Sequence, residues 1–452
     1  MRIFVKRGSR PRAFRSLKVA LLATAVAGPA VLTGCSSSSA NGGTPTVTVW
    51  SWRSQDQPVW QTVQNDLAKK GVDVTIDFRA INPTSYDAVL RTAMNGGSGP
   101  DIFYDRGGEG TQTYGAAGFA KPLDGIIDKS GFTPSTLATA QYKGKTYGVP
   151  FAIQTMSVLY NKDLLAKYHL SVPQTWDQWI QEMKTLKSKG VTPLTFMGVQ
   201  QWMLALQIDA VGASTMSNQF TQDLTDRKAS FTDQPYVQTL TAFQQLAPYL
   251  EDNWQSTGSQ GNEQQTQFAL GKSAFDIDGI FDTAAIYQVN PAMKLGQFLV
   301  PSPDGGTPKI DWYPDGNISM NAHIKDPAEE KAAEKVVAFS ATKPFGDAFS
   351  SVAGEISPIS GVQIPAKYDV AQQAAQLYRN QAISPLFGIR SPMDTPNPDP
   401  SSLTKKNSPA STPGIFDAEQ KIAVPLLEGK ITPQQAAQQV QDSEKWYFNG
   451  SN

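Results

Sequence analysis

Residues 144–163, GKTYGVPFAIQTMSVLYNKD, decide how the rest of the chain is interpreted. The pair Lys143-Gly144 is a tight-turn signal between two tyrosine-containing segments, which predicts a short hairpin. Pro150 has no backbone N–H to donate, so a strand must be interrupted there or lie at an edge. The run 156–160 is rich in residues that favour strands, and Asn161 is suited to cap a following helix. The residues alone therefore predict a hairpin, a broken strand and a helix.

The chain before this stretch alternates between strand and helix patterns. Residues 47–50 and 72–78 alternate apolar and polar side chains, and 100–104 is a third strand candidate. Helical stripes cover 58–70 and 84–95, the latter with a possible capping box at its start. This order predicts a parallel sheet with right-handed crossovers, in which ligands bind beyond the carboxyl ends of the strands.

The chain after this stretch continues in the same way. Helices are expected over 175–189, from 327 after a cap at Asp326, and from 433 after a cap at Thr432. Trp176 and Trp179 share one helix face, which indicates core positions. Further strands are expected over 191–196, 273–278, 295–300 and 316–324. A proline- and serine-rich segment, 391–414, is typical of a long surface loop.

The first 34 residues have the pattern of a secretory leader. They hold seven Lys or Arg and no Asp or Glu, and the run 19–31 is apolar but too short to span a bilayer. Cys35, the only cysteine of the chain, follows directly and stands where a bacterial lipoprotein receives its lipid. We expect residues 1–34 to be removed and 35–45 to be a lipid-anchored tether. A single cysteine also excludes an intramolecular disulfide.

Removal of the leader would make the protein acidic. Lys plus Arg falls from 39 to 32 against 40 Asp plus Glu, a net charge near −8. An acidic surface argues against nucleic-acid partners and against binding anionic lipids through basic patches. We therefore expect membrane contact through the lipid anchor only.

The sequence offers little support for catalysis or for a metal. His169 and His323 are the only histidines, and neither has a partner at metal-ligand spacing. There is no nucleophile-elbow motif, no dinucleotide fingerprint and no phosphate loop. No local spacing singles out a pair of carboxylates for glycoside hydrolysis. We expect no enzyme activity, no cofactor and no metal.

Several short motifs, in this order, resemble the family 1 extracellular solute-binding proteins of ABC importers, the group that includes maltose-binding protein. They are YGVP (147–150), LYNKDLL (159–165), PQTW (173–176), KGVTP (189–193), GKSAF (271–275) and ITPQQAA (431–437). The resemblance implies an α/β, two-lobed periplasmic-binding-protein-like fold (type II), in which each lobe is a mostly parallel sheet flanked by helices and the ligand binds between the lobes.

In that family, the run through 147–165 carries the chain from the first lobe to the second. We expect the first lobe to comprise residues 46–154 and 290–342, and the second 155–289 and 343–452. The crossovers would then fall near 153–158, 283–294 and 340–345.

Aromatic and polar residues gather at the predicted strand ends. Sugar CH faces stack on aromatic rings, and sugar hydroxyls need planar polar partners in a pre-formed cleft. Aligned with the family, Gln154 takes a position where an acidic ligand residue can occur, and Phe281 takes that of a stacking Trp. The candidate ligand-binding residues are Trp52, Arg53, Asp105, Arg106, Glu109, Gln154, Trp202, Asp278, Phe281, Trp312, Asp315 and Arg390.

Structural roles remain open for several of these candidates. Trp52 could instead belong to the core of the first sheet. Arg53 and Arg106 could be solvated or paired with nearby carboxylates. Asp278 could be a turn residue before Gly279, whereas Trp202 follows two glutamines at a loop-to-helix junction, which favours a cleft position.

The residues and the resemblance together lead to one expected function. The protein would be a monomeric, extracytoplasmic lipoprotein, anchored to the cell membrane through Cys35, that captures a sugar or short oligosaccharide. It would deliver this ligand to an ABC permease and, through it, to a separate ATPase. Alternatives are the same fold binding a polyol, a glycerophosphodiester or another polar solute, a carbohydrate-active surface enzyme, and a binding lipoprotein without a transport role. Arg53 and Arg106 keep a phosphate-bearing ligand open.

Overall fold

The computed structural model describes residues 43–259, 261–383 and 414–449. The expected leader, Cys35, most of the 35–45 tether, Arg390 and nearly all of the 391–414 segment lie outside the described residues. From Thr44 onward the described chain forms one unit that is built on two sheets.

The first sheet has the strand order β2-β1-β3-β12-β6. Its first three strands are parallel, with Val49 opposite both Phe78 and Ile102, as the strand–helix alternation predicts. The strands β12 and β6 are antiparallel to their neighbours, so the sheet is mixed where mostly parallel strands were expected. The elements are β1 (Thr46–Ser51), α1 (Gln57–Lys69), β2 (Thr75–Ala80), α2 (Pro83–Asn95), β3 (Ile102–Arg106), β6 (Gly148–Pro150) and β12 (Gly316–Met320).

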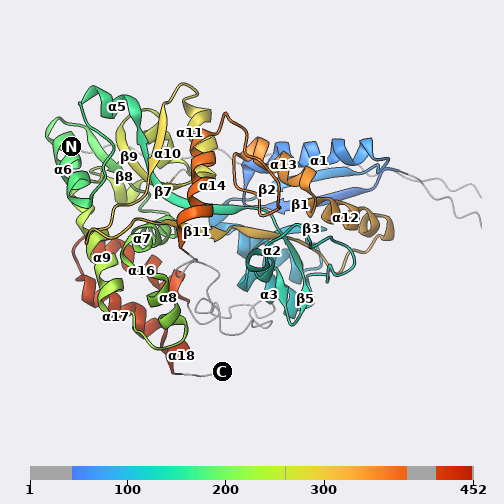
Figure 1. Cartoon of the computed structure of the whole chain (residues 1–452). Helices are drawn as coiled ribbons and strands as arrows, with labels where there is room; N and C mark the ends of the chain where they lie inside the picture. Colours follow the sequence, from blue (N-terminus) through green and yellow to red (C-terminus); the bar gives the residue numbers. More distant parts are fainter. Residues whose placement is uncertain (1–42, 260, 384–413, 450–452) are drawn as a thin grey trace, which may run out of the picture. The chain divides into compact units, whose positions relative to one another are not determined.

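The second sheet has the order β13-β11-β7-β9-β8, with β10 also paired to β7. Strand β7 is the long run after Pro150, and almost all of it is buried. It is antiparallel to β9, β10 and β11, so this sheet is mixed as well. The elements are β7 (Ile153–Asn161), β8 (Thr192–Thr195), β9 (Ser273–Gly279), β10 (Leu295–Phe298), β11 (Ile310–Pro314) and β13 (Ala382–Ile383) (Figure 1).

The pairing corrects two of the expected lobe assignments. Strands β10 and β11 pair with β7 in the second sheet, although 290–342 was assigned to the first lobe. Helix α13 (Lys343–Ala353) buries Phe345 and Phe349 in the core of the first sheet, although 343–452 was assigned to the second lobe. Figure 1 shows α13 beside α1 over the first sheet.

The crossovers between the sheets shift accordingly. The chain passes between them at 150–153, at 314–316 and after Ala353, where Ile356 forms a bridge with Ile153. The first lies at the edge of the expected 153–158, but the expected crossovers at 283–294 and 340–345 are wrong. The cause is that β10 and β11 return along β7 as antiparallel neighbours before the chain leaves this sheet.

Helices cover both sheets. Helix α7 (Gln201–Thr215) packs on β7, β9 and β11 and is buried almost all round, because α9 (Gln234–Gln245) and α16 (Ile415–Leu427) pack against it. Trp176 and Trp179 of α6 (Trp176–Ser188) are buried, as predicted. The other helices are α3 (Glu109–Ala116), α4 (Pro134–Ala138), α5 (Lys162–Lys167), α8 (Asn218–Thr225), α10 (Glu263–Ala269), α11 (Thr283–Val289), α12 (Pro327–Ser340), α14 (Asp369–Gln381), α17 (Pro433–Ser443) and α18 (Lys445–Phe448). None of the helices in the described ranges has the length and apolar character that a membrane span requires.

Local sequence signals are confirmed at most element ends. Asn161 and Asp326 cap α5 and α12 through their side chains, and Thr432 forms a complete capping box with Gln435. Thr175 caps α6 by accepting from Gln178 N, and the Gln178 side chain accepts from Gln174 N. The turn at 143–144 has both φ angles positive and joins β4 (Gln141–Tyr142) to β5 (Lys145–Thr146).

Buried carboxyl groups join the C-terminal helices to the rest of the second sheet's core. Glu419 of α16 is fully buried and accepts from the Tyr236 hydroxyl at 2.8 Å. Burial raises the pKa of Glu419 to about 8. Burial, together with the charges of Glu419 and Asp417, raises the pKa of Glu444 from 4.5 to about 9. Both groups therefore favour the protonated form in the folded protein.

Alkaline pH is expected to destabilise the fold through Glu444. Because the folded-state pKa lies above the unfolded value, the stabilisation is complete below about pH 4.5 and is lost as the pH rises towards about 9. The melting temperature should therefore fall between pH 6 and pH 9. Glu444→Gln should reduce this fall, whereas Glu428→Gln at an exposed position should not. Equal pH dependence of all three proteins would contradict the assignment.

Candidate ligand-binding site

Arg53, at the end of β1, is buried among carboxylates. Its side chain is 3% exposed, and Nε donates to Asp56 at 3.0 Å and Nη1 to Asp315 at 2.7 Å. Nη2 donates to Glu355, and the guanidinium carbon lies 5.5 Å from the ring centroids of both Phe151 and Phe349. The positive charge of Arg53 is therefore paired with carboxylates of the protein and not presented to a ligand.

The same cluster contains Gln154 and draws on all three crossovers. Gln154 Nε2 donates to Asp315 at 3.1 Å and to Glu355 at 2.6 Å. Gln154 lies at the first crossover, Asp315 at the second and Glu355 at the third. The structure thus brings the candidates Arg53, Gln154 and Asp315 together, but in a buried cluster. Arg53 is paired with carboxylates, which is the structural role that the sequence left open for it.

Removal of the Arg53 charge should destabilise the protein strongly. Arg53→Met leaves three buried carboxylates without their cation, and breaking a buried ion cluster in this way costs about 3–5 kcal/mol of unfolding free energy. Lys69→Met breaks an exposed pair with Asp66 and should cost less than about 1 kcal/mol. Chemical denaturation of both variants measures the difference. Similar losses in the two would contradict a central role for Arg53.

Trp52, Asp105 and Arg106 lie beside this cluster in the first sheet. Trp52 is 8% exposed, packs edge-on against Tyr86 and Tyr104, and belongs to the core of this sheet. The Arg106 guanidinium stacks over the Trp52 ring at 3.8 Å. Asp105 accepts from the hydroxyls of Thr111 and Ser319. The side chain of Glu109, at the start of α3, lies outside the described set.

Asp278 and Phe281 lie at the end of β9. Gln265 Nε2 donates to Asp278 at 2.9 Å and to Asp282 at 2.6 Å, and Asp278 also accepts from Gly279 N. Burial, then the charge of a neighbouring aspartate, raises the pKa of both Asp278 and Asp282. Trp312 instead packs against Tyr378 of α14 with ring centroids 5.0 Å apart.

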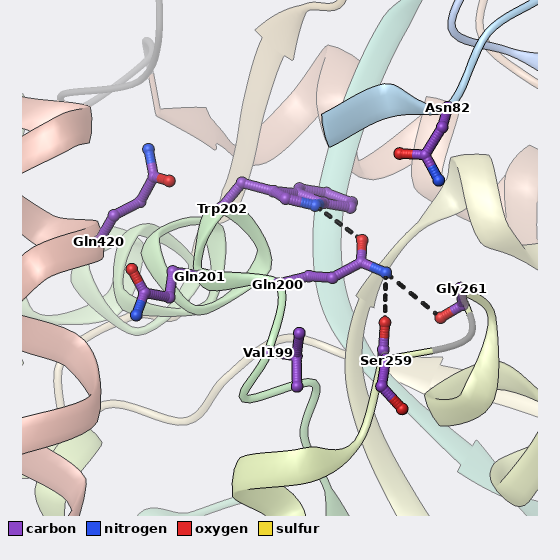
Figure 2. A pocket seen from close by; sticks show the side chains of 9 residues that line it. Asn82, Val199, Gln200, Gln201, Trp202, Ser259, Gly261 and Gln420 are labelled. Atoms are coloured by element: carbon purple, nitrogen blue, oxygen red, sulfur yellow. Dashed lines mark hydrogen bonds between the residues drawn. The ribbon is translucent and has the colours of Figure 1, made fainter. Parts of the chain in front are cut away.

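Trp202, at the start of α7, lines a cavity of about 690 Å³. Its Nε1 donates to Gln200 Oε1 at 2.9 Å, and its ring lies 6.3 Å from that of Phe281. Figure 2 shows the indole bonded to Gln200, with the side chains of Asn82, Gln201 and Gln420 drawn around the same cavity. The lining residues are Asn82, Val199, Gln200, Gln201, Trp202, Gly258, Ser259, Gly261 and Gln420.

Among the candidate residues, only Trp202 belongs to the described lining of this cavity. Asn82 was missed, although it follows the carboxyl end of β2 and the strand-end rule could have found it. Gln420 had no sequence signal, because it lies on a C-terminal helix far along the chain. None of the described lining residues is charged, so the cavity suits an uncharged polar solute.

A second cavity of about 660 Å³ lies where residues 356–364 meet α14. Its wall includes several isoleucines together with Tyr378 and Arg379. Within the described residues, no group of three or more His, Cys, Asp or Glu is placed to hold a metal ion.

The two sheets, their three crossovers and a cavity lined by uncharged polar groups define a solute-binding protein of α/β architecture. Residues 51–344 match the family model of the bacterial extracellular solute-binding proteins, and the chain belongs to this family. An extracytoplasmic location follows from this membership.

Curated relatives carry sugar-binding names. The chain is 24% identical to the multiple sugar-binding protein of Streptococcus mutans, over 69% of this chain and 78% of that protein. It is also 24% identical to the diacetylchitobiose binding protein DasA of Streptomyces coelicolor, over 73% of this chain and 77% of that one.

Solved structures show the same fold. A chitin oligosaccharide binding protein superposes with a TM-score of 0.73 at 21% identity, over 90% of this chain and 100% of that one. The binding protein RafE in complex with raffinose gives a TM-score of 0.66 at 19% identity, over 88% and 98%. The two-lobed binding-protein fold expected from the sequence is confirmed.

Proposed function

We propose that this protein captures a neutral sugar or short oligosaccharide in the cavity beside Trp202, without turnover, and delivers it to a membrane permease served by a separate ATPase. The observation that carries the proposal is the pairing of an indole ring with uncharged amide side chains in one cavity. The sugar-binding names of the relatives support it.

The chemistry of the cavity fits a sugar. The indole offers a flat apolar face for the CH groups of a pyranose ring. Side-chain amides both donate and accept, so each can bind a hydroxyl in either sense. The volume of about 690 Å³ is within the usual range of small-molecule sites.

A phosphate-bearing ligand is less well supported. Arg53 is bound by three carboxylates, and Arg106 stacks on Trp52. Neither arginine is among the cavity residues, and the described lining contains no other cation. A glycerophosphodiester would bring a negative charge into this wall without a counter-charge there.

Delivery rests on motion about the three crossovers. In our proposal, ligand binding draws the part built on the first sheet towards the part built on the second, a hinge closure that the permease recognises. Asn82 belongs to the first part, and Trp202 and Gln420 to the second, so a ligand in the cavity contacts both.

Trp202→Ala should weaken sugar binding about 10- to 100-fold, because the stacking face and its buried area are lost. The ligand is first found by thermal shift with neutral oligosaccharides and phosphorylated polyols, since saturation at 100 times Kd adds about 2.7 kcal/mol. Calorimetry then compares the variant with Trp50→Ala, a tryptophan of β1 outside the cavity. Unchanged affinity in Trp202→Ala would refute the placement, and hits confined to phosphorylated compounds would refute the sugar.

We further propose that Cys35 carries the lipid anchor. Cys35→Ser, expressed in a bacterium that processes lipoproteins, should move the protein from the membrane fraction to the soluble fraction, because it removes the sulfur that bears the lipid. Fractionation and immunoblotting beside the unchanged protein measure this. Retention of the variant in the membrane fraction at the wild-type level would show that another element holds it there.

A further inference from the structure

We propose that Gln200 is a positioning residue, which locks the Trp202 ring and the glycine loop (Gly258, Ser259 and Gly261) into one wall of the cavity before ligand arrives. This inference rests on the proposed function only in its effect on sugar affinity. The wall itself is a property of the ligand-free protein.

Both polar atoms of the Gln200 side chain are bonded to protein groups. Its Oε1 accepts from Trp202 Nε1 at 2.9 Å, and its Nε2 donates to the carbonyls of Gly258 at 2.9 Å and Gly261 at 3.4 Å. Gln200 stands at the N-cap position of α7 but makes no capping bond with its side chain. Figure 2 shows this side chain extending from the start of α7 to the glycine loop.

The glycine loop is built to receive this contact. Glu263 accepts from the backbone N–H of Gly258 at 2.6 Å and of Ser259 at 3.1 Å, which closes the loop on itself. Gly258 has a φ of +96°, and a Cβ there would lie 2.2 Å from Met197 Cγ. The position therefore needs glycine, both for its backbone and for its space.

The backbone on both sides of Gln200 is tied to the same segment. Gly198 N donates to Trp254 O at 3.0 Å, and Val199 N donates to Thr257 O at 3.2 Å. Residues 198–200 and 254–258 thus run together, and the Gln200 side chain extends the attachment to the indole. Such a wall is ordered before binding, so less conformational entropy is lost when the ligand binds.

This arrangement divides the polar groups of the cavity into two kinds. The only N–H donor of the Trp202 side chain is taken by Gln200, so the indole meets the sugar through its ring face alone. Gln201 and Gln420 line the cavity and have no side-chain partner among the described residues. We therefore assign ligand hydrogen bonds to these two amides and not to Gln200.

The test uses the whole mature protein labelled with 5-fluorotryptophan. The chain has nine tryptophans, and Trp202→Phe assigns the Trp202 fluorine signal by its loss. Gln200→Met removes both the acceptor and the donor. It should shift or broaden the Trp202 signal, while the seven signals other than those of Trp202 and Trp254 keep their positions, which also shows that the variant is folded. The Trp254 signal is left out because this residue belongs to the attached segment.

Two further variants sharpen the reading. Gln200→Glu keeps the acceptor for the indole but loses the donor to the glycine loop, so it should retain more of the wild-type Trp202 signal than Gln200→Met. If Gln200→Met does not fold, the Trp202 signal of Gln200→Glu still tests the proposal. Gln201→Met, at the neighbouring exposed amide, should leave the Trp202 signal unchanged.

Affinity for the sugar found with the wild-type protein gives the second readout. Gln200→Met should lower it about tenfold, and this loss should largely disappear in a Trp202→Phe background, because the two residues act as one unit. A Trp202 signal that Gln200→Met leaves unchanged would overturn the proposal, as would an undiminished affinity in that variant. A wild-type protein that binds no sugar would instead refute the proposed function, while the fluorine spectra would still decide the role of Gln200.

Discussion

The ion cluster around Arg53 is the interaction on which the arrangement of the two sheets depends. A guanidinium that is 3% exposed must have every N–H paired, because an unpaired buried charge costs several kcal/mol. Its partners Asp315 and Glu355, with Gln154 bound to both, lie one at each crossover. The polar contacts therefore join the three places where the chain passes between the sheets.

The cluster and the cavity divide the chemistry of the protein between them. The crossovers hold a buried cluster of one guanidinium and three carboxyl groups, whereas the described cavity wall holds an indole and neutral amides. Because these side chains are bonded to one another, hinge motion in our proposal falls to the backbone of the crossovers. Because the described wall is uncharged, selectivity for the ligand depends on the geometry of hydrogen bonds and ring stacking. The helix α7 connects the two, since it packs on β7 and also carries Trp202 at its start.

Local signals predicted much of the fold, and non-local pairings account for the errors. Strict alternation and caps placed β1 to β3 and α12 well, because both depend on neighbouring residues. The sheet joined by β10 depends on a partner, β7, that lies far away in the sequence. Arg53 was assigned to a ligand by the strand-end rule, but two of its carboxylates are 262 and 302 residues away. Trp202 could be predicted because its signal is local, whereas Gln420 reaches the cavity only through contacts between segments far apart in the sequence.

The central place of β12 in the first sheet has a consequence for the chain as it is made. Strand β12 pairs with β3 on one side and β6 on the other, and its residues are 316–320. Until these residues have left the ribosome, β6 has no neighbour in this sheet and β3 presents an unpaired edge. More than two thirds of the polypeptide must therefore exist before its N-terminal strands can reach their final pairing. A chain ordered in this way cannot complete its first sheet before most of its length has been made.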